Sequence, residues 1–239
     1  MGKNLIQQRR GRGTSTFRAP SFRYAGEVKH AKAAEGIRKA RITDIIHSAG
    51  HSSPLAEVVF ENMEKLLVFA PQGARVGDLI FYGEKVPLSA GNVMPLKSIP
   101  DGTGIHNIES FPGDGGKFVR ASGTVARVVS KTGSAVIVQL PSKKQRIFNS
   151  ECRASIGVIA GSGRLEKPLM KAGIVFHKRG AKNRFYPRTS GVAMNAVAHP
   201  YGGTSSSHKG RPGIARRFAP PGAKVGKLRP KRTGRRKVK

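Results

Sequence analysis

The central part of the chain carries short runs of apolar and β-branched residues. They fill residues 41–46, 55–60, 65–70 and 78–82, and clusters of Gly, Pro, Ser and Asn separate them. Closely spaced runs of this kind are typical of strands that follow one another in a small β structure. The pattern therefore predicts one small antiparallel barrel.

A second set of runs follows a Pro- and Gly-rich passage at 86–116. Its predicted strands are residues 118–121, 124–129, 135–140, 146–148 and 155–159. Two stretches between these strands, Lys131-Thr132-Gly133 and Pro141-Ser142-Lys143-Lys144, predict hairpin turns. Residues 37–166 number about 130, which is enough for two barrels, each near the lower size for a self-sufficient core.

Both ends of the chain lack this pattern. Residues 1–26 carry Gly, Ser, Thr and Pro in place of an apolar period, which predicts an arm. Residues 167–172 predict one or two helical turns, and Gly, Pro, Ser and Arg dominate from Gly173 onward. Alone, this last segment buries too little apolar area to offset its ordering entropy, so we expect it to be disordered or extended. The predicted parts are an N-terminal arm (1–36), two barrels (37–85 and 86–166) and a C-terminal region (167–239).

Charge supports this division. The chain has 44 Lys and Arg against 13 Asp and Glu, a net charge of +31. Residues 37–166 hold sixteen basic and eleven acidic residues, near the balance of a globular domain, whereas residues 167–239 hold twenty basic and no acidic residues. Net charge this far from zero repels itself, so such a segment needs a polyanionic partner. The charge predicts a nucleic-acid-binding protein.

Several other classes of function find no support. No run approaches the roughly 20 apolar residues of a membrane-spanning helix, and no apolar segment of a signal peptide is present, so no membrane partner is expected. Cys152 is the single cysteine, which leaves no disulfide framework, and we expect it to be buried. His47 and His51 lie in a predicted turn, so no metal site is expected. Gly161-Ser162-Gly163 lacks the flanking spacing of a nucleotide motif, so no cofactor is expected.

The two ends interleave aromatic residues with cations. Aromatic rings stack on unpaired bases for about 1–3 kcal/mol each while guanidinium groups hold phosphates; the alternative is that these rings pack on the barrels. Phe17, Tyr201 and Phe218 are the better RNA candidates because Gly, Pro and Arg surround them. The candidate RNA-binding residues are Arg9, Arg10, Arg12, Phe17, Arg18, Arg188, Gly191, Met194, Asn195, His199, Pro200, Tyr201, Gly202, Gly203, Arg211, Arg216, Arg217, Arg232, Arg235 and Arg236.

The last sixteen residues, 224–239, include nine Lys or Arg. Their expected role is to neutralise phosphates with release of counterions, which makes binding weaker as salt rises. The alternative is a solvated tail or a patch like a nuclear-localisation signal. One tail can serve both purposes.

The segment 190–203 combines small residues with one amide, one imidazole and a Pro-Tyr-Gly-Gly turn. His199 has the ordinary pKa range of a general base. A base also needs a nucleophile and an orienting group, and Ala198 supplies neither. We therefore expect His199 to hydrogen bond or stack with RNA, and we predict no catalytic residue and no enzyme activity.

This segment resembles the universal ribosomal protein two family of the large subunit, whose pattern is Gly-Val-Ala-Met-Asn-Pro-Val-(acid)-His-Pro-(aromatic or His)-Gly-Gly. Residues 7–13 are similar to the archaeal and eukaryotic type of arm in that family, and the match covers nearly the whole chain. Further family motifs occur in order at Pro112-Gly113-Asp114-Gly115-Gly116, Arg120-Ala121-Ser122-Gly123-Thr124, Leu140-Pro141-Ser142, Glu151-Cys152-Arg153-Ala154-Ser155-Ile156-Gly157 and Lys171-Ala172-Gly173.

The resemblance implies a mainly β fold: an OB-like barrel, then an SH3-like barrel, with extended basic N- and C-terminal arms. It implies a cytoplasmic, ribosomal location in the large subunit, with large-subunit rRNA, other large-subunit proteins and small-subunit rRNA at the subunit interface as partners. Members of the family bind rRNA near the peptidyl-transferase region and are associated with subunit joining, tRNA binding and peptide-bond formation. Residues Met194, Asn195, His199, Gly202 and Gly203 would line the RNA-facing loop.

Four positions depart from the family pattern. Ala196 replaces the usual Pro, Ala198 the acid, Ser190 an Arg and Thr204 a Gly. The missing acid removes the neighbour that would orient His199, which argues against the second hypothesis, acyl transfer assisted by this histidine. A third hypothesis, a DNA-compacting or single-strand-binding protein, also fits an OB-like barrel with basic tails.

Overall fold

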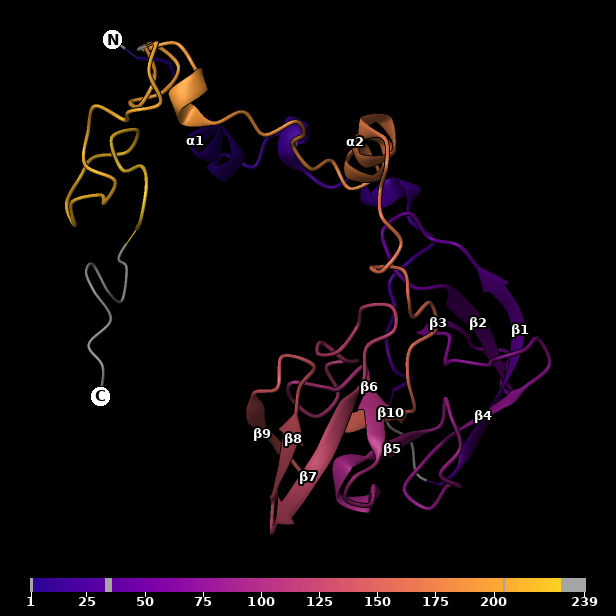
Figure 1. Cartoon of the computed structure of the whole chain (residues 1–239). Coiled ribbons are helices and arrows are strands. Elements are labelled where there is room, and N and C mark those ends of the chain that lie inside the picture. The colour runs from indigo at the N-terminus through magenta and orange to yellow at the C-terminus, as the bar shows by residue number, and fades with distance from the viewer. Residues whose placement is uncertain (1, 33–35, 204, 229–239) are drawn as a thin grey trace. The chain divides into compact units, whose positions relative to one another are not determined.

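Ten strands pair into a single sheet in the computed structural model, which describes residues 2–32, 36–203 and 205–228 (Figure 1). The sheet order is β3-β2-β1-β4-β5-β10-β6-β7-β8-β9, and β4 with β5 is the parallel pair. The chain forms two units: unit 1 joins Met1–Pro20 with Lys171–Lys239, and unit 2 is Ser21–Met170. The strands, all in unit 2, are β1 (Arg38–Ile46), β2 (Leu55–Phe60), β3 (Lys65–Phe69), β4 (Leu79–Tyr82), β5 (Val93–Pro95), β6 (Gly104–His106), β7 (Ala126–Thr132), β8 (Ala135–Gln139), β9 (Gln145–Asn149) and β10 (Arg153–Ile156).

The first four strands form an antiparallel half of the sheet around their own core. In β1 the buried residues Ala40 and Ile42 alternate with exposed Lys39 and Arg41, the period expected when one face of a strand is covered. Ala40 pairs with Phe60 of β2, and all three apolar side chains belong to one hydrophobic cluster. These strands confirm the first predicted set: β2 has the predicted bounds, and the ends of the other three strands differ by at most three residues.

The other strands surround a second cluster that includes Leu96, Ile105, Val136 and Phe148. Both predicted hairpin turns are confirmed. Thr132 pairs with Ala135 across the β7–β8 turn, and Gln139 pairs with Gln145 across the β8–β9 turn. The prediction of a mainly β chain is therefore confirmed.

Three predicted strand assignments are corrected. Residues 118–121 form no strand, because Phe118 makes a single bridge to Ile108 and Val119 has a φ of 55°, outside the β region. The Pro- and Gly-rich passage 86–116, read as a connection, contains β5 and β6. The strand predicted at 155–159 is β10, which ends before Gly157, whose φ is 99°.

Within the described residues, both arms contain more regular structure than the sequence predicts. Helix α1 (Ile6–Gly11) lies in the N-terminal arm, and α2 (Ala172–Gly180) begins where the predicted helical turns were expected to end. The prediction of a disordered or extended segment from residue 173 is thus wrong for α2. Four short 3₁₀ helices complete the regular structure of the described residues: Ser15–Phe17, Ser21–Arg23, Leu96–Ser98 and Gly191–Ala193.

Two smaller expectations concern burial and membranes. Cys152 is fully buried in the second cluster, as expected, and burial raises the pKa of its thiol to about 11. Within the described residues, no helix has the length and apolar character to cross a bilayer.

Candidate nucleic-acid interface

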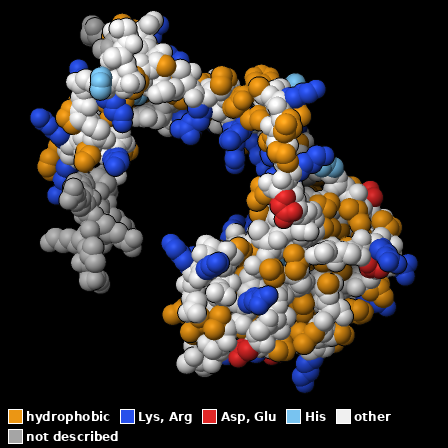
Figure 2. All heavy atoms as spheres, in the orientation of Figure 1, with side chains coloured by type: hydrophobic (Ala, Val, Ile, Leu, Met, Phe, Trp, Pro, Cys, Tyr) orange, Lys and Arg blue, Asp and Glu red, His pale blue; other side chains and the backbone are white. Residues whose placement is uncertain are grey.

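Unit 1 combines a basic sequence with an ordered backbone. Its sequence holds 24 Lys and Arg and no Asp or Glu. Helix α1 carries exposed Arg9 and Arg10 in its last turn, and the backbone N–H of Leu5 donates to Gln8 Oε1 at its start (2.9 Å). Figure 2 shows Lys and Arg side chains on the surface of this unit. Within the described residues, 17 of the charges expected to meet a polyanion are thus held on a folded support.

A small apolar cluster joins the two ends of the chain within unit 1. Leu5, Tyr201 and Val225 are buried against one another, with Val192 packed at their side. The Tyr201 hydroxyl donates to the carbonyl oxygen of Pro212 (3.3 Å). The Tyr201 side chain is 6% exposed, so its ring supports the fold of the loop. Sequence reasoning placed this ring among the RNA contacts because Leu5, one of its packing partners, lies almost 200 residues earlier in the chain.

The loop that resembles the family pattern closes on itself through backbone hydrogen bonds. Gly203 N–H donates to Met194 O (3.1 Å), and Ala198 N–H donates to Asn195 O (2.9 Å). A Cβ at Gly202 would collide with the carbonyl oxygens of Met194 and Asn195, so the turn requires glycine there. The N-terminal arm joins the loop through a bond from Lys3 N–H to Val197 O (2.8 Å).

The hydrogen bonds of the loop fix the tautomer of His199. The backbone N–H of Tyr201 donates to His199 Nδ1 (3.1 Å), so Nδ1 carries no proton and the neutral ring carries its proton on Nε2. Burial lowers the pKa of His199, which favours this neutral form. Gly191 has no side chain, and this leaves room for the imidazole ring of His199. His199 can therefore present an N–H donor to an acceptor on RNA.

His199 lines three adjoining cavities, which bring many of the predicted residues together. The largest, about 670 Å³, also contains Arg9, Arg10, Arg188 and Met194 among its lining. One of about 370 Å³ includes Pro200 and Arg211. The third, about 300 Å³, includes Tyr201, Lys224 from the predicted basic tail, and Lys209, which the sequence prediction omitted.

The N-terminal arm has a second anchor in unit 1. The Asn183 side-chain amide donates to the carbonyl oxygens of Ser15 (3.2 Å), Thr16 (2.8 Å) and Arg18 (2.9 Å). Sequence reasoning missed Asn183, and no local pattern distinguishes it from a surface asparagine. It holds the arm at the residues that carry Phe17 and Arg18.

The remaining predicted residues lie outside these cavities. Arg12, Arg18, Arg216 and Arg217 are exposed, and Arg217 lies over the ring of Phe218 (5.3 Å), which is 88% exposed. Phe17 lies under Arg10 (5.9 Å). Arg232, Arg235 and Arg236 lie outside the described residues.

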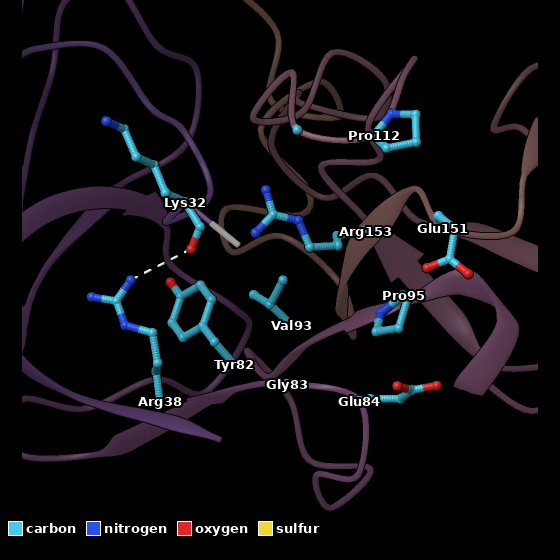
Figure 3. Close-up of a pocket in the computed structure, with 11 residues that line it drawn as sticks. Lys32, Arg38, Tyr82, Gly83, Glu84, Val93, Pro95, Pro112, Glu151 and Arg153 are labelled. Atoms are coloured by element: carbon cyan, nitrogen blue, oxygen red, sulfur yellow. Dashed lines mark hydrogen bonds between the residues drawn. The ribbon is translucent and has the colours of Figure 1, made fainter. Parts of the chain in front are cut away.

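Unit 2 contains a separate pocket of about 310 Å³ (Figure 3). Its charged groups serve the fold: Arg153 pairs with the buried Glu109 (2.7 Å), and Glu84 and Glu151 both pair with Lys97 (2.9 and 3.1 Å). Burial alone would raise the pKa of Glu109, but hydrogen bonds from the Arg153 side chain and backbone lower it. Among the described residues, no group of three His, Cys, Asp or Glu side chains lies close enough to hold a metal.

The Glu109–Arg153 pair also links two motifs of the family resemblance. Glu109 accepts the backbone N–H groups of Gly113 (3.3 Å) and Gly115 (3.2 Å), which lie in the loop 112–116. Arg153 belongs to the motif 151–157 and also donates to Ala31 O (2.6 Å). These motifs therefore have a structural reason to occur together.

Comparison with known proteins gives the same family as the motifs. The family described as "Ribosomal Proteins L2, C-terminal domain" matches residues 89–219. "Large ribosomal subunit protein uL2" of Natronomonas pharaonis is 49% identical over 236 residues, covering 98% of this chain and 97% of its own. The proteins of the same name from Archaeoglobus fulgidus and Haloarcula marismortui are 46% and 47% identical, covering 99% and 98% of this chain and 100% and 98% of their own. With this agreement along nearly its whole length, the chain belongs to the uL2 family of large ribosomal subunit proteins.

Proposed function

We propose that this protein is a structural, non-enzymatic constituent of the large ribosomal subunit that binds its rRNA near the peptidyl-transferase region. In that place it would support subunit association, tRNA binding and peptide-bond formation. Its other partners would be large-subunit proteins and, at the subunit interface, small-subunit rRNA. The observation that carries the proposal is unit 1: its sequence holds 24 Lys and Arg and no Asp or Glu, and 17 of these cations lie in its described, folded part, in a chain of this family. The division into arm, OB-like barrel, SH3-like barrel and C-terminal region belongs to the same proposal.

The physical support is the match between this site and RNA. Arginines around the largest cavity suit phosphates, and the neutral His199 ring offers a donor to a base, a phosphate or a 2′-hydroxyl. The sequence predicted these contacts in the N-terminal arm and the C-terminal region. Unit 1 contains parts of both, Met1–Pro20 and Lys171–Lys239.

The triple variant Arg9→Ala, Arg10→Ala, Arg188→Ala tests the proposal. Each arginine that contacts a phosphate adds about 1 to the slope of log affinity against log salt, so we expect the slope for large-subunit rRNA fragments to fall by about 3. The control Lys39→Ala, Arg41→Ala, Lys65→Ala removes the same charge from exposed positions of β1 and β3. Equal slopes for the two triple variants would contradict a phosphate-binding site in unit 1.

The enzymatic alternative predicts a different result for His199→Ala. A general base contributes about 10²–10⁴-fold to a rate, whereas a binding role predicts that correctly assembled subunits keep their rate of peptide-bond formation within about twofold. Assembly is scored separately by sedimentation, because the variant also removes the acceptor for Tyr201 N–H. A hundredfold loss of rate in normally assembled particles would establish catalysis.

A further inference from the structure

The charge of unit 2 is distributed unevenly. Residues 37–114 hold seven Lys and Arg and nine Asp and Glu, whereas residues 115–150 hold seven Lys and Arg and no acidic residue. The second range contains β7, β8 and β9. The near balance of residues 37–166 is therefore the average of an acidic part and a basic part.

Strands β7, β8 and β9 have one buried and one outward face. Val128, Val136, Val138 and Phe148 are buried in the second hydrophobic cluster. The positions between them point the other way, because successive side chains of a strand alternate. They define the β7–β9 face: Arg127, Val129, Ile137, Gln139, Gln145, Ile147 and Asn149.

The register arranges this face in rows. Arg127 pairs with Gln139, which pairs with Gln145, so one row carries a guanidinium and two amides. Ile137 and Ile147 form the next row, and a bulge between Val128 and Ser130 adds Val129. Ile147 is 67% exposed and Val129 41%. Figure 2 shows hydrophobic side chains at the β7–β9 end of unit 2, with Lys and Arg side chains nearby.

Six of the seven cations of this segment fall into two groups. Lys131 Nζ donates to Lys97 O (2.8 Å), Arg146 lies over the Phe118 ring (4.3 Å), and Arg120 donates to two carbonyl oxygens. Arg127, Lys143 and Lys144 are exposed, and the described part of the chain offers them no ion-pair partner. Arg127 belongs to the face on β7, and Lys143 and Lys144 border it from the β8–β9 turn.

We propose that the β7–β9 face binds the minor groove of a double-helical RNA segment, as a second RNA surface that the unit 1 site does not include. The minor groove of an RNA helix is wide and shallow and displays 2′-hydroxyl groups, which suits a sheet face. Gln139, Gln145 and Asn149 can exchange hydrogen bonds with hydroxyls, and Arg127 and the lysines can reach phosphates. The inference rests on the proposed function in its choice of RNA.

Charge complementarity favours RNA over a protein partner. The centres of protein interfaces are depleted of charged residues and enriched in aromatic residues. The β7–β9 face has three aliphatic side chains, no aromatic residue, three amides and bordering cations. Its segment is also free of acidic residues, as unit 1 is.

The first test compares two triple variants of the full-length protein. Arg127→Ala, Lys143→Ala, Lys144→Ala is expected to weaken binding to a 20-base-pair RNA duplex about tenfold and to lower the salt slope by 2 to 3. The matched control is again Lys39→Ala, Arg41→Ala, Lys65→Ala, which changes the net charge equally on the acidic part of unit 2. Equal effects of the two variants overturn the face as a site. Failure of wild-type protein to bind large-subunit rRNA would instead overturn the proposed function.

The second test leaves the charge unchanged. Because the 2′-hydroxyl distinguishes RNA from DNA, Gln139→Ala with Gln145→Ala is expected to reduce the preference for the RNA duplex over a DNA duplex of the same sequence about fivefold. Both positions are exposed, and unfolding curves verify that the variant keeps its stability. An unchanged RNA-to-DNA ratio contradicts minor-groove binding, and so does a hydroxyl-radical footprint confined to unpaired RNA.

Discussion

Arg153→Met is expected to lower the free energy of unfolding by about 3–5 kcal/mol, because it leaves the Glu109 carboxylate buried without its counterion. Glu109 is fully buried, and Arg153 donates to both of its oxygens from Nε (3.3 Å) and Nη2 (2.7 Å). The variant also removes the bond to Ala31 O. Urea or guanidinium unfolding at pH 7 measures the loss.

Two comparisons show whether the loss comes from the buried charge. Glu109→Gln combined with Arg153→Met removes both charges and is expected to recover a large part of the stability. Lys65→Met breaks the exposed pair with Glu57 (3.8 Å) and should change stability by less than about 1 kcal/mol. If Arg153→Met behaved like Lys65→Met, the pair would not stabilise the junction of the two motifs.

Stability is expected to fall steeply as the pH drops from about 6.5 toward 4. Burial lowers the pKa of His30 to about 4 and that of His106 to about 4, against an ordinary value of 6.5. Within this window the unfolded chain binds protons that the folded chain excludes, so stability is full above pH 6.5 and is lost as the pH falls. Each histidine contributes about 1.4 kcal/mol per pH unit.

The measurement is the free energy of unfolding between pH 8 and pH 5, above the range in which Glu109 takes up a proton. His30 Nε2 donates to Asn107 O (2.7 Å), and a Gln side-chain amide at position 30 can supply the same donor. His106 Nδ1 donates to Gly157 O (3.0 Å), and an Asn side-chain amide at position 106 can supply that one. The double variant His30→Gln, His106→Asn should flatten the curve, whereas His47→Gln at an exposed position should not. A steep slope retained in the double variant would assign it to other groups.

The strands were predictable where local pattern and burial agree. Residues 55–60 and 135–140 have β-branched runs between turn residues, and each became a strand of the sheet. Strands β5 and β6 were missed because each has three residues and both pair with β10, about 50 to 60 residues later in the chain, with β4 and β7 as their other neighbours. No local window contains that partner.

The candidate site was predictable in its chemistry and only partly in its geometry. The absence of acid, together with the loop around His199, indicated RNA binding before any fold was known. The burial of Tyr201 depends on Leu5 and Val225, and the tautomer of His199 depends on the path of the backbone at Tyr201. The β7–β9 face was hidden because counting charge over residues 37–166 averages two opposite halves.

The joining of both chain ends in unit 1 has a consequence for the order of synthesis. All ten strands of unit 2 are complete once residue 156 is made, so the sheet can pair while the rest of the chain is still being translated. Leu5 can be buried only after Tyr201 and Val225 have been synthesised. The carbonyl oxygens of Ser15 and Thr16 can accept their hydrogen bonds only after Asn183 has been synthesised. Unit 1, the most basic part of the protein, therefore folds last. Until then its basic N-terminal segment is accessible to any nearby RNA or chaperone.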